Sequence, residues 1–181
     1  RFEPLEYDHF WLSDTPEVIA SSTWGNGVRR MVSWVHFRDR VTGRTFYFWN
    51  THLDHEVQAA RERSAELIRQ RIGRLPTDSP LFLVGDFNSI AAANRTYDIL
   101  TKEAGLTDTW SAARERRKED TNSFTGFGTL RHEGERIDWI LARGAMDVRA
   151  TEVVTFRHGD QWPSDHLPVM AWITLRQAPD Q

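Results

Sequence analysis

The chain has 181 residues, enough for one domain with a substantial core, and 39% of them are hydrophobic, including eight Trp and ten Phe. It lacks Cys, which excludes disulfides and thiol catalysis and leaves the compartment open between cytoplasm and exterior, and no apolar stretch approaches the roughly 20 residues that cross a bilayer. A net charge of −3 provides no global basic field, which argues against tight, sequence-independent binding to nucleic acid.

The first quarter of the chain predicts one side of a β-sheet. Residues Phe2 to Leu12 mix apolar and acidic side chains and predict an edge strand. Arg30 to Arg38 is an aromatic and β-branched run, and Thr45 to Asn50 is a second such run. The segment between them, Asp39 to Arg44, contains Thr-Gly and is typical of a hairpin turn, so the two runs are predicted to pair antiparallel.

The middle of the chain alternates helical and strand patterns. Apolar residues recur at helical spacing from Glu56 to Arg74, which predicts an amphipathic helix whose charged face is solvated. The apolar run Pro80 to Gly85 predicts a central strand buried on both faces. Ala92 to Ala104 predicts a second helix that stops at Gly105.

The last part of the chain contains three further predicted strands. Thr107 to Glu135 is irregular and charged, and we interpret it as a solvated loop in preference to a substrate clamp. Strands are predicted over Arg136 to Ala142, Met146 to Phe156 and Val169 to Leu175.

Polar residues interrupt these apolar strands or lie directly before or after them. A structural role is available for each residue alone, as a buried hydrogen-bonded His, a turn, an edge position or a cap. Three carboxylates at one end of a sheet would nevertheless repel one another unless a cation or an imidazolium offset them. A hard divalent metal, Mg²⁺ or Mn²⁺, fits oxygen ligands in a chain without Cys. The residues in question are His52, Asp86, Asn88, Asp138, Asp165 and His166.

Four strings carry a family resemblance: NTHLDH (50 to 55), VGDFNS (84 to 89), RIDWIL (136 to 141) and PSDHLPV (163 to 169). In this order they resemble the endonuclease/exonuclease/phosphatase superfamily of metal-dependent phosphoesterases, typified by deoxyribonuclease I. FWLSDTPE (10 to 17) and the stretch 124 to 127 resemble a bacterial branch of it. The resemblance implies a four-layer α/β sandwich, with two mainly antiparallel β-sheets face to face and helices outside.

The resemblance also implies catalytic roles for five residues. His166 matches the general base that takes a proton from the attacking water, and Asp138 matches the carboxylate that holds the imidazole. Asp86 matches the acid that orients the nucleophile, and Asn88 the amide that binds a phosphate oxygen. His52 matches the imidazole that stabilises the phosphoryl charge or assists the leaving group.

The resemblance further implies metal and substrate contacts. Asp165 and Asp86 are expected at the metal, Mg²⁺ or Mn²⁺. His55 and Asn88 are expected to contact substrate, and Arg30 either contacts a phosphate or is a plain surface Arg. Because Asp165 and His166 are neighbours along the chain, their side chains point apart, and Asp138 is the better partner for His166.

The family's first strand with its Asn, and the later Gln-Glu pair whose Glu is the principal metal ligand, find no match here. We therefore expect residues 1–181 to be a single domain that lacks its first strands and helix. The predicted function is Mg²⁺-dependent hydrolysis of phosphoester bonds by a monomer; the alternative is an inactive relative with a binding role. The substrate is open among small phosphoesters, lipid headgroups and nucleic acid.

Overall fold

A computed structural model describes residues 1–176. The larger sheet contains, in spatial order, β1 (Phe2–Trp11), β2 (Met31–Asp39), β3 (Thr45–His52), β4 (Leu81–Asp86), β7 (Asp138–Arg143) and β5 (Thr107–Asp108). The smaller sheet contains β6 (Glu115–Arg117), β8 (Met146–Val153) and β9 (Val169–Leu175). The helical segments are α1 (Gln58–Ile72), α2 (Arg95–Asp98), the π-helix η1 (Ile99–Glu103) and α3 (Thr109–Ala112).

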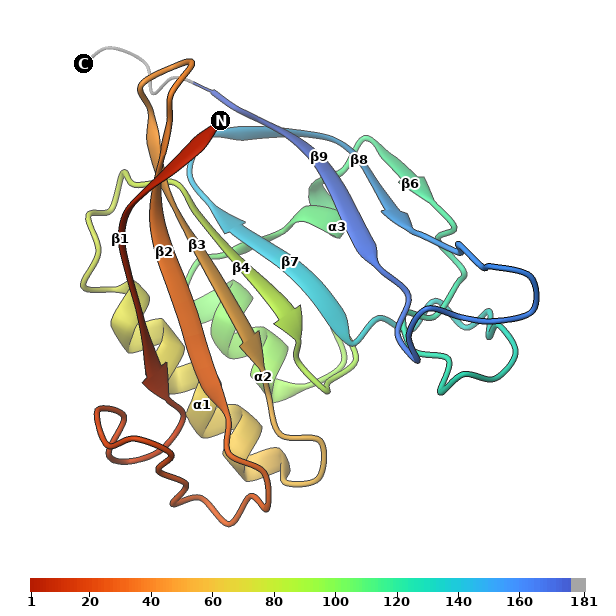
Figure 1. Cartoon of the computed structure of the whole chain (residues 1–181), viewed down its shortest axis with the longest axis horizontal. Coiled ribbons are helices and arrows are strands. Elements are labelled where there is room, and N and C mark those ends of the chain that lie inside the picture. Colours follow the sequence, from red (N-terminus) through yellow and green to blue (C-terminus); the bar gives the residue numbers. More distant parts are fainter. Residues whose placement is uncertain (177–181) are drawn as a thin grey trace.

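The two sheets and their helices form an α/β sandwich, as the sequence predicts (Figure 1). Strand β1 is an edge strand, and β1, β2 and β3 pair antiparallel in chain order. Helix α1 packs on one face of the larger sheet, and the smaller sheet lies beyond the other face. None of the helices within residues 1–176 has the length and apolar character that crossing a membrane requires.

The crossover from β3 through α1 to β4 brings the ends of two parallel strands together. Ala65, Ile68 and Ile72 of α1 are buried against the sheet, so the helix returns the chain to the strand beside β3. Gly85 allows the close approach of the strands, because a Cβ there would lie 1.8 Å from the carbonyl oxygen of Thr51. The polar residues that end β3 and β4 are therefore neighbours.

The second helix is shorter and less regular than predicted. The side chain of Asn94 accepts a hydrogen bond from the Tyr97 amide, so it caps the helix and α2 begins only at Arg95. The chain then widens into the π-helix η1, in which the Ala104 amide donates to Ile99. The capping side chain thus places the helix start three residues after the predicted one.

Strand limits also differ from the sequence prediction. Strand β7 begins at Asp138 rather than Arg136, because Arg136 points into a buried ion pair with Asp108 and its carbonyl accepts from Ala91. Strand β8 ends at Val153, before the predicted Phe156. The segment predicted as an irregular loop contains the short elements β5, α3 and β6.

Strand β4 is central but is buried on one face only, which corrects the prediction of burial on both. Leu81 and Leu83 are fully buried beneath the helices. Phe82 and Val84 are half-buried and line an apolar groove of about 520 Å³ between the sheets, opposite Ile173 of β9. The described residues thus leave part of the inter-sheet face open.

Candidate active site

Three neighbouring strands place polar residues in one row across the larger sheet. In the parallel pair β3 and β4, His52 lies opposite Asp86. In the antiparallel pair β4 and β7, Asp86 lies opposite Asp138. This register, which follows from the apolar strands and the α1 crossover, gathers the three polar residues at one end of the sheet.

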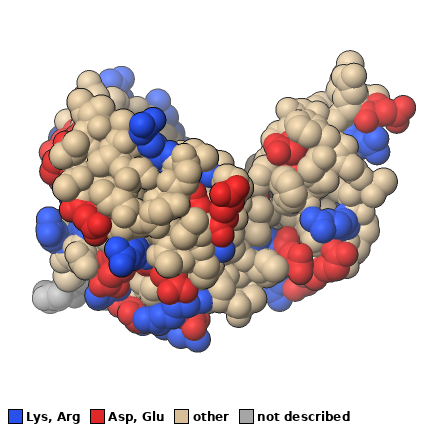
Figure 2. Space-filling view, turned by 90° about the horizontal axis from the view of Figure 1, so that it is seen from below, with Lys and Arg blue, Asp and Glu red and all other residues tan. Residues whose placement is uncertain are grey.

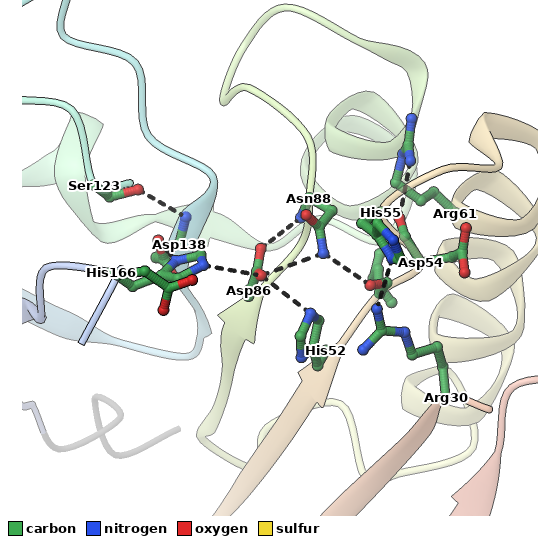
Figure 3. A network of polar contacts seen from close by, with 12 residues as sticks. Arg30, His52, Asp54, His55, Arg61, Asp86, Asn88, Ser123, Asp138 and His166 are labelled. Atoms are coloured by element: carbon green, nitrogen blue, oxygen red, sulfur yellow. Dashed lines mark hydrogen bonds and ion pairs between the residues drawn. The ribbon is translucent and has the colours of Figure 1, made fainter. Parts of the chain in front are cut away.

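His166 reaches this row from the loop before β9. Its Nδ1 atom lies 3.0 Å from Oδ2 of Asp138, and its Nε2 atom lies 3.7 Å from Oδ2 of Asp86. The side chain of His166 is 26% exposed, which leaves it accessible from the pocket. Asp138 therefore orients the ring, and the nitrogen on the other side of the ring faces Asp86 (Figure 3).

Asp86 is the centre of the polar network. Its Oδ2 atom lies 3.1 Å from Nε2 of His52, and its Oδ1 atom accepts from the main-chain amide of Asn88 at 2.8 Å. The Asn88 side-chain amide reaches Oδ2 of Asp86 at 3.2 Å and the carbonyl of Leu53 at 3.0 Å. Phe87, between them in the chain, is fully buried against Trp139, so Asp86 and Asn88 lie side by side.

The electrostatic environment keeps Asp86 ionised. Burial raises the pKa of its carboxyl, but hydrogen bonds from His52 and the Asn88 amide outweigh that effect and lower it. For Asp138, burial dominates and raises the pKa, while hydrogen bonds from His166 and Ser123 limit the rise. For His166, burial alone would lower the pKa, but Asp138 and the nearby carboxylates raise it.

The raised pKa of His166 predicts a pH dependence. In protein freed of divalent metal, the imidazole is expected to titrate above its usual pKa of 6.5. Below that pKa the ring is protonated and cannot accept a proton from water, so a rate that depends on it falls as the pH drops. Asp138→Asn should lower the pKa, because it removes the carboxylate that stabilises the charged ring. NMR titration of the imidazole measures both values; a pKa unaffected by Asp138→Asn contradicts the expectation.

Arg30 and His55 lie on the far side of His52 from His166 (Figure 3). A guanidinium nitrogen of Arg30 is 3.2 Å from Nδ1 of His55, and the Arg30 Nε is buried without a hydrogen-bond partner. Asp54 fixes the loop that carries His55 by accepting from the Glu56 and Val57 amides. Both residues border the network as candidate substrate contacts.

A set of possible metal-binding atoms lies within the network. Asp86, Asp138 and His166 offer ligand atoms within 4.8 Å of one another. Asp165 is not part of that set; it is half-buried, with Ser164 near its carboxylate at 3.3 Å. Asp86 is the member of this set that the sequence predicts to bind a metal. Its role as a metal ligand, and that of Asp165, stay predictions.

The network opens into a pocket of about 450 Å³ between the sheets. Asp86, Asp138 and His166 form its polar wall, and Val84 and Ile140 belong to its apolar wall. Such a concave site, with a few convergent polar groups, suits a small ligand.

Two polar contacts near the site were not predicted from sequence. Ser123 bonds to the start of β7, and Arg136 forms a buried ion pair with Asp108 at 3.0 Å, beneath the same strand. Each contact joins segments far apart in the chain. The Arg directly before the apolar string of β7 is the one sequence signal that points to the second contact.

Comparison with known proteins matches this arrangement to a family. The sequence model of the Endonuclease/Exonuclease/phosphatase family covers residues 6–166, most of the chain. The chain belongs to this family. Its polar row and its His-Asp pair thus lie within the segment that the family shares.

Solved structures of this family resemble the chain in sequence and fold. Mannosyl-6-phosphatase Bt3783 from Bacteroides thetaiotaomicron VPI-5482 is 31% identical, with a TM-score of 0.84 over 97% of this chain and 68% of that one. An endonuclease/exonuclease/phosphatase from Bacteroides vulgatus is 30% identical, with a TM-score of 0.87 over 97% of this chain and 67% of that one. These likenesses confirm the deoxyribonuclease I-like sandwich.

A curated relative matches a shorter part of the chain. The uncharacterized protein L388 of Acanthamoeba polyphaga mimivirus is 31% identical over an alignment of 108 residues, and the match covers 54% of this chain and 40% of that protein. The chain therefore spans less than half of this relative and about two thirds of the two solved structures.

Proposed function

We propose that the protein is a metal-dependent hydrolase of phosphoester bonds. The observation that carries the proposal is the His166–Asp138 pair, whose outer imidazole nitrogen faces the Asp86 carboxylate inside one pocket. A histidine oriented in this way is suited to take a proton from water. Membership of a family of phosphoester hydrolases supports the same reaction class.

The mechanism assigns each side chain a task. Asp138 accepts the Nδ1 hydrogen of His166, so Nε2 is left free to accept the proton of the attacking water. Asp86, 3.7 Å from that nitrogen, orients the same water. His52 and Asn88, both hydrogen-bonded to Asp86, stabilise the negative charge on the phosphoryl oxygens.

A divalent cation fits the donor atoms at this site. The half-buried carboxylate of Asp86, beside Asp138 and His166, would hold Mg²⁺ or Mn²⁺, both of which prefer oxygen ligands; Asp165, the second ligand expected from the sequence, lies outside that cluster. When bound, the cation neutralises charge that develops on the phosphoryl group. It would also offset the repulsion between Asp86 and Asp138, which lie opposite each other on adjacent strands.

We propose a small phosphomonoester, such as a sugar phosphate, as the substrate class. The 31% identity to a mannosyl-6-phosphatase over nearly the whole chain supports it. The net charge of −3 disfavours nucleic acid as the substrate, and on the face drawn in Figure 2 acidic and basic side chains are interspersed rather than gathered into a basic track. In this proposal Arg30 and His55, on the far side of His52 from His166, would contact the part of the substrate beyond the phosphate.

A substrate panel on the full-length protein tests the proposal. It should contain sugar phosphates, a phosphodiester and single-stranded DNA, each with Mg²⁺, Mn²⁺ or EDTA. We expect the fastest hydrolysis with a sugar phosphate and a loss of activity in EDTA. Preference for DNA would overturn the substrate class. No hydrolysis of any phosphoester would favour the alternative of a binding-only relative.

We further propose that additional polypeptide completes this domain by covering the apolar groove between the sheets. The groove is lined by Phe48, Phe82 and Ile173, and the exposed fraction of Phe48 is 38%. The chain covers only about two thirds of the two solved structures, which supports the proposal. A longer protein should unfold at a higher temperature than residues 1–181 alone; equal unfolding temperatures would argue against it.

A further inference from the structure

The segment from Ser123 to Gly126 connects the two halves of the His-Asp pair. On one side it contacts the start of β7, which carries Asp138, and on the other it contacts the loop that carries His166. The ring of Phe124 lies 4.9 Å from the imidazole of His166, centroid to centroid. A single short segment therefore touches both partners of the pair.

Ser123 makes the central contacts of this segment. Its Oγ atom accepts a hydrogen bond from the amide of Ile137 at 3.0 Å. It also accepts one from the amide of Asp138 at 3.3 Å (Figure 3). Its main-chain carbonyl accepts from the amide of Leu167 at 2.7 Å, and its own amide donates to Glu135 at 3.0 Å. Ser123 is thus hydrogen-bonded both to the start of β7, which carries Asp138, and to the residue that follows His166.

The hydroxyl hydrogen of Ser123 also needs an acceptor. The side chain is fully buried, so water does not take this hydrogen, and Oγ already accepts two amides. Asp138, whose amide Ser123 already binds, also carries a half-buried carboxylate, and the neighbouring Ser123 hydroxyl opposes the rise that burial causes in the pKa of that carboxyl. Ser123 is thus joined to Asp138 through the main-chain amide of Asp138, and Asp138 is joined to His166 through its carboxylate.

Thr125 and Gly126 fix the loop that carries His166. The amides of both residues donate to the carbonyl of Asp165, at 2.8 and 3.1 Å, and the Thr125 hydroxyl donates to the same oxygen at 3.0 Å. Three donors on one carbonyl fix the peptide that joins Asp165 to His166. The direction in which the imidazole leaves the chain is fixed with it.

We infer that Ser123 is a positioning residue for the general base, because it ties Asp138 and the His166 loop into one geometry. This role rests on the proposed function, since it concerns the same pair. It adds a residue that contacts neither the pocket nor the reacting atoms. Without the hydroxyl, the Ile137 and Asp138 amides would lose their acceptor, and Asp138 would be held less firmly beside His166.

The test compares Ser123→Ala with Thr109→Val in the full-length protein. Thr109 is also a buried hydroxyl bonded to β7, donating to the Ile140 carbonyl at 2.8 Å, so it controls for general weakening of the strand. Two properties are measured at fixed pH: the low-field NMR signal of the His166 Nδ1 hydrogen, assigned by its loss in His166→Ala, and kcat with KM.

Ser123→Ala is expected to shift or broaden the signal and to lower kcat about ten- to a hundredfold, with KM changed less than about threefold. Thr109→Val should leave the Nδ1 signal and the kinetic constants as in the wild type. Ser123→Thr, which keeps the hydroxyl, should retain the Nδ1 signal. If Ser123→Ala does not fold, Ser123→Cys, with its weaker donor, should show the same two losses.

Two results would overturn the inference: an unchanged Nδ1 signal in the variant that lacks the hydroxyl, or equal losses in Thr109→Val. Failure of the proposed function has a different signature. In that case His166→Ala would leave hydrolysis unchanged while the Nδ1 signal of the metal-free protein still responded to Ser123→Ala.

Discussion

His166→Ala is expected to lower kcat/KM for phosphoester hydrolysis by about 10²- to 10⁴-fold, the range of general acid-base catalysis. The substitution removes the group that accepts the proton of the attacking water, and the other imidazole that contacts Asp86, that of His52, lies on the other side of that carboxylate (Figure 3). The effect should fall on kcat, because the proton moves only as the reaction proceeds. Steady-state kinetics at saturating Mg²⁺ measure it.

A matched control for this substitution is His132→Ala. His132 also has an Asp partner, with its Nδ1 atom 3.1 Å from Asp120, but its side chain is 53% exposed and lies outside the network. The His132→Ala variant should therefore retain wild-type kinetics. Equal activity of His166→Ala and the wild type would remove His166 from the mechanism.

Asp86→Asn is the second substitution with a large expected effect. It keeps the side chain's shape but removes the charge that faces both His52 and His166. We expect kcat/KM to fall by at least about a hundredfold, because orientation of the water and metal binding both depend on this carboxylate. Calorimetric titration with Mg²⁺ or Mn²⁺ should show weaker binding, which kinetics alone would not reveal.

Asp147→Asn provides the comparison for this loss of charge. Asp147 pairs with Arg114 and Arg176 at the surface, so the same change there should alter neither metal affinity nor rate. Wild-type metal affinity in Asp86→Asn would mean that the cation binds through other residues.

Much of the fold is predictable because its periodic patterns are strong. The aromatic and β-branched runs pair as predicted, and the apolar face of α1 packs where its spacing indicates. The predicted start of the second helix was wrong, because the position of this start depends on a single capping side chain, that of Asn94. The prediction for β4 was wrong on one face, since the apolar run of Phe82 and Val84 does not reveal whether both faces are covered.

The part of the candidate site that lies at strand ends was predictable from the sequence. His52, Asp86 and Asp138 come together because the strand ladder places them opposite one another. Ser123 was missed because its contacts join a loop to β7 and to the 165–167 segment, with no periodicity to indicate them. Spacing along the chain likewise does not reveal that three donors meet at the Asp165 carbonyl.

The most direct test of the central claim, that His166 and Asp138 act as one unit, is a double-mutant cycle in Mg²⁺ with the preferred phosphoester. Asp138→Asn alone should lower kcat at least about tenfold, because the imidazole loses its oriented tautomer. Added to His166→Ala, it should cause almost no further loss. Losses that multiply in the double variant would show that the two residues act independently, and would contradict the account.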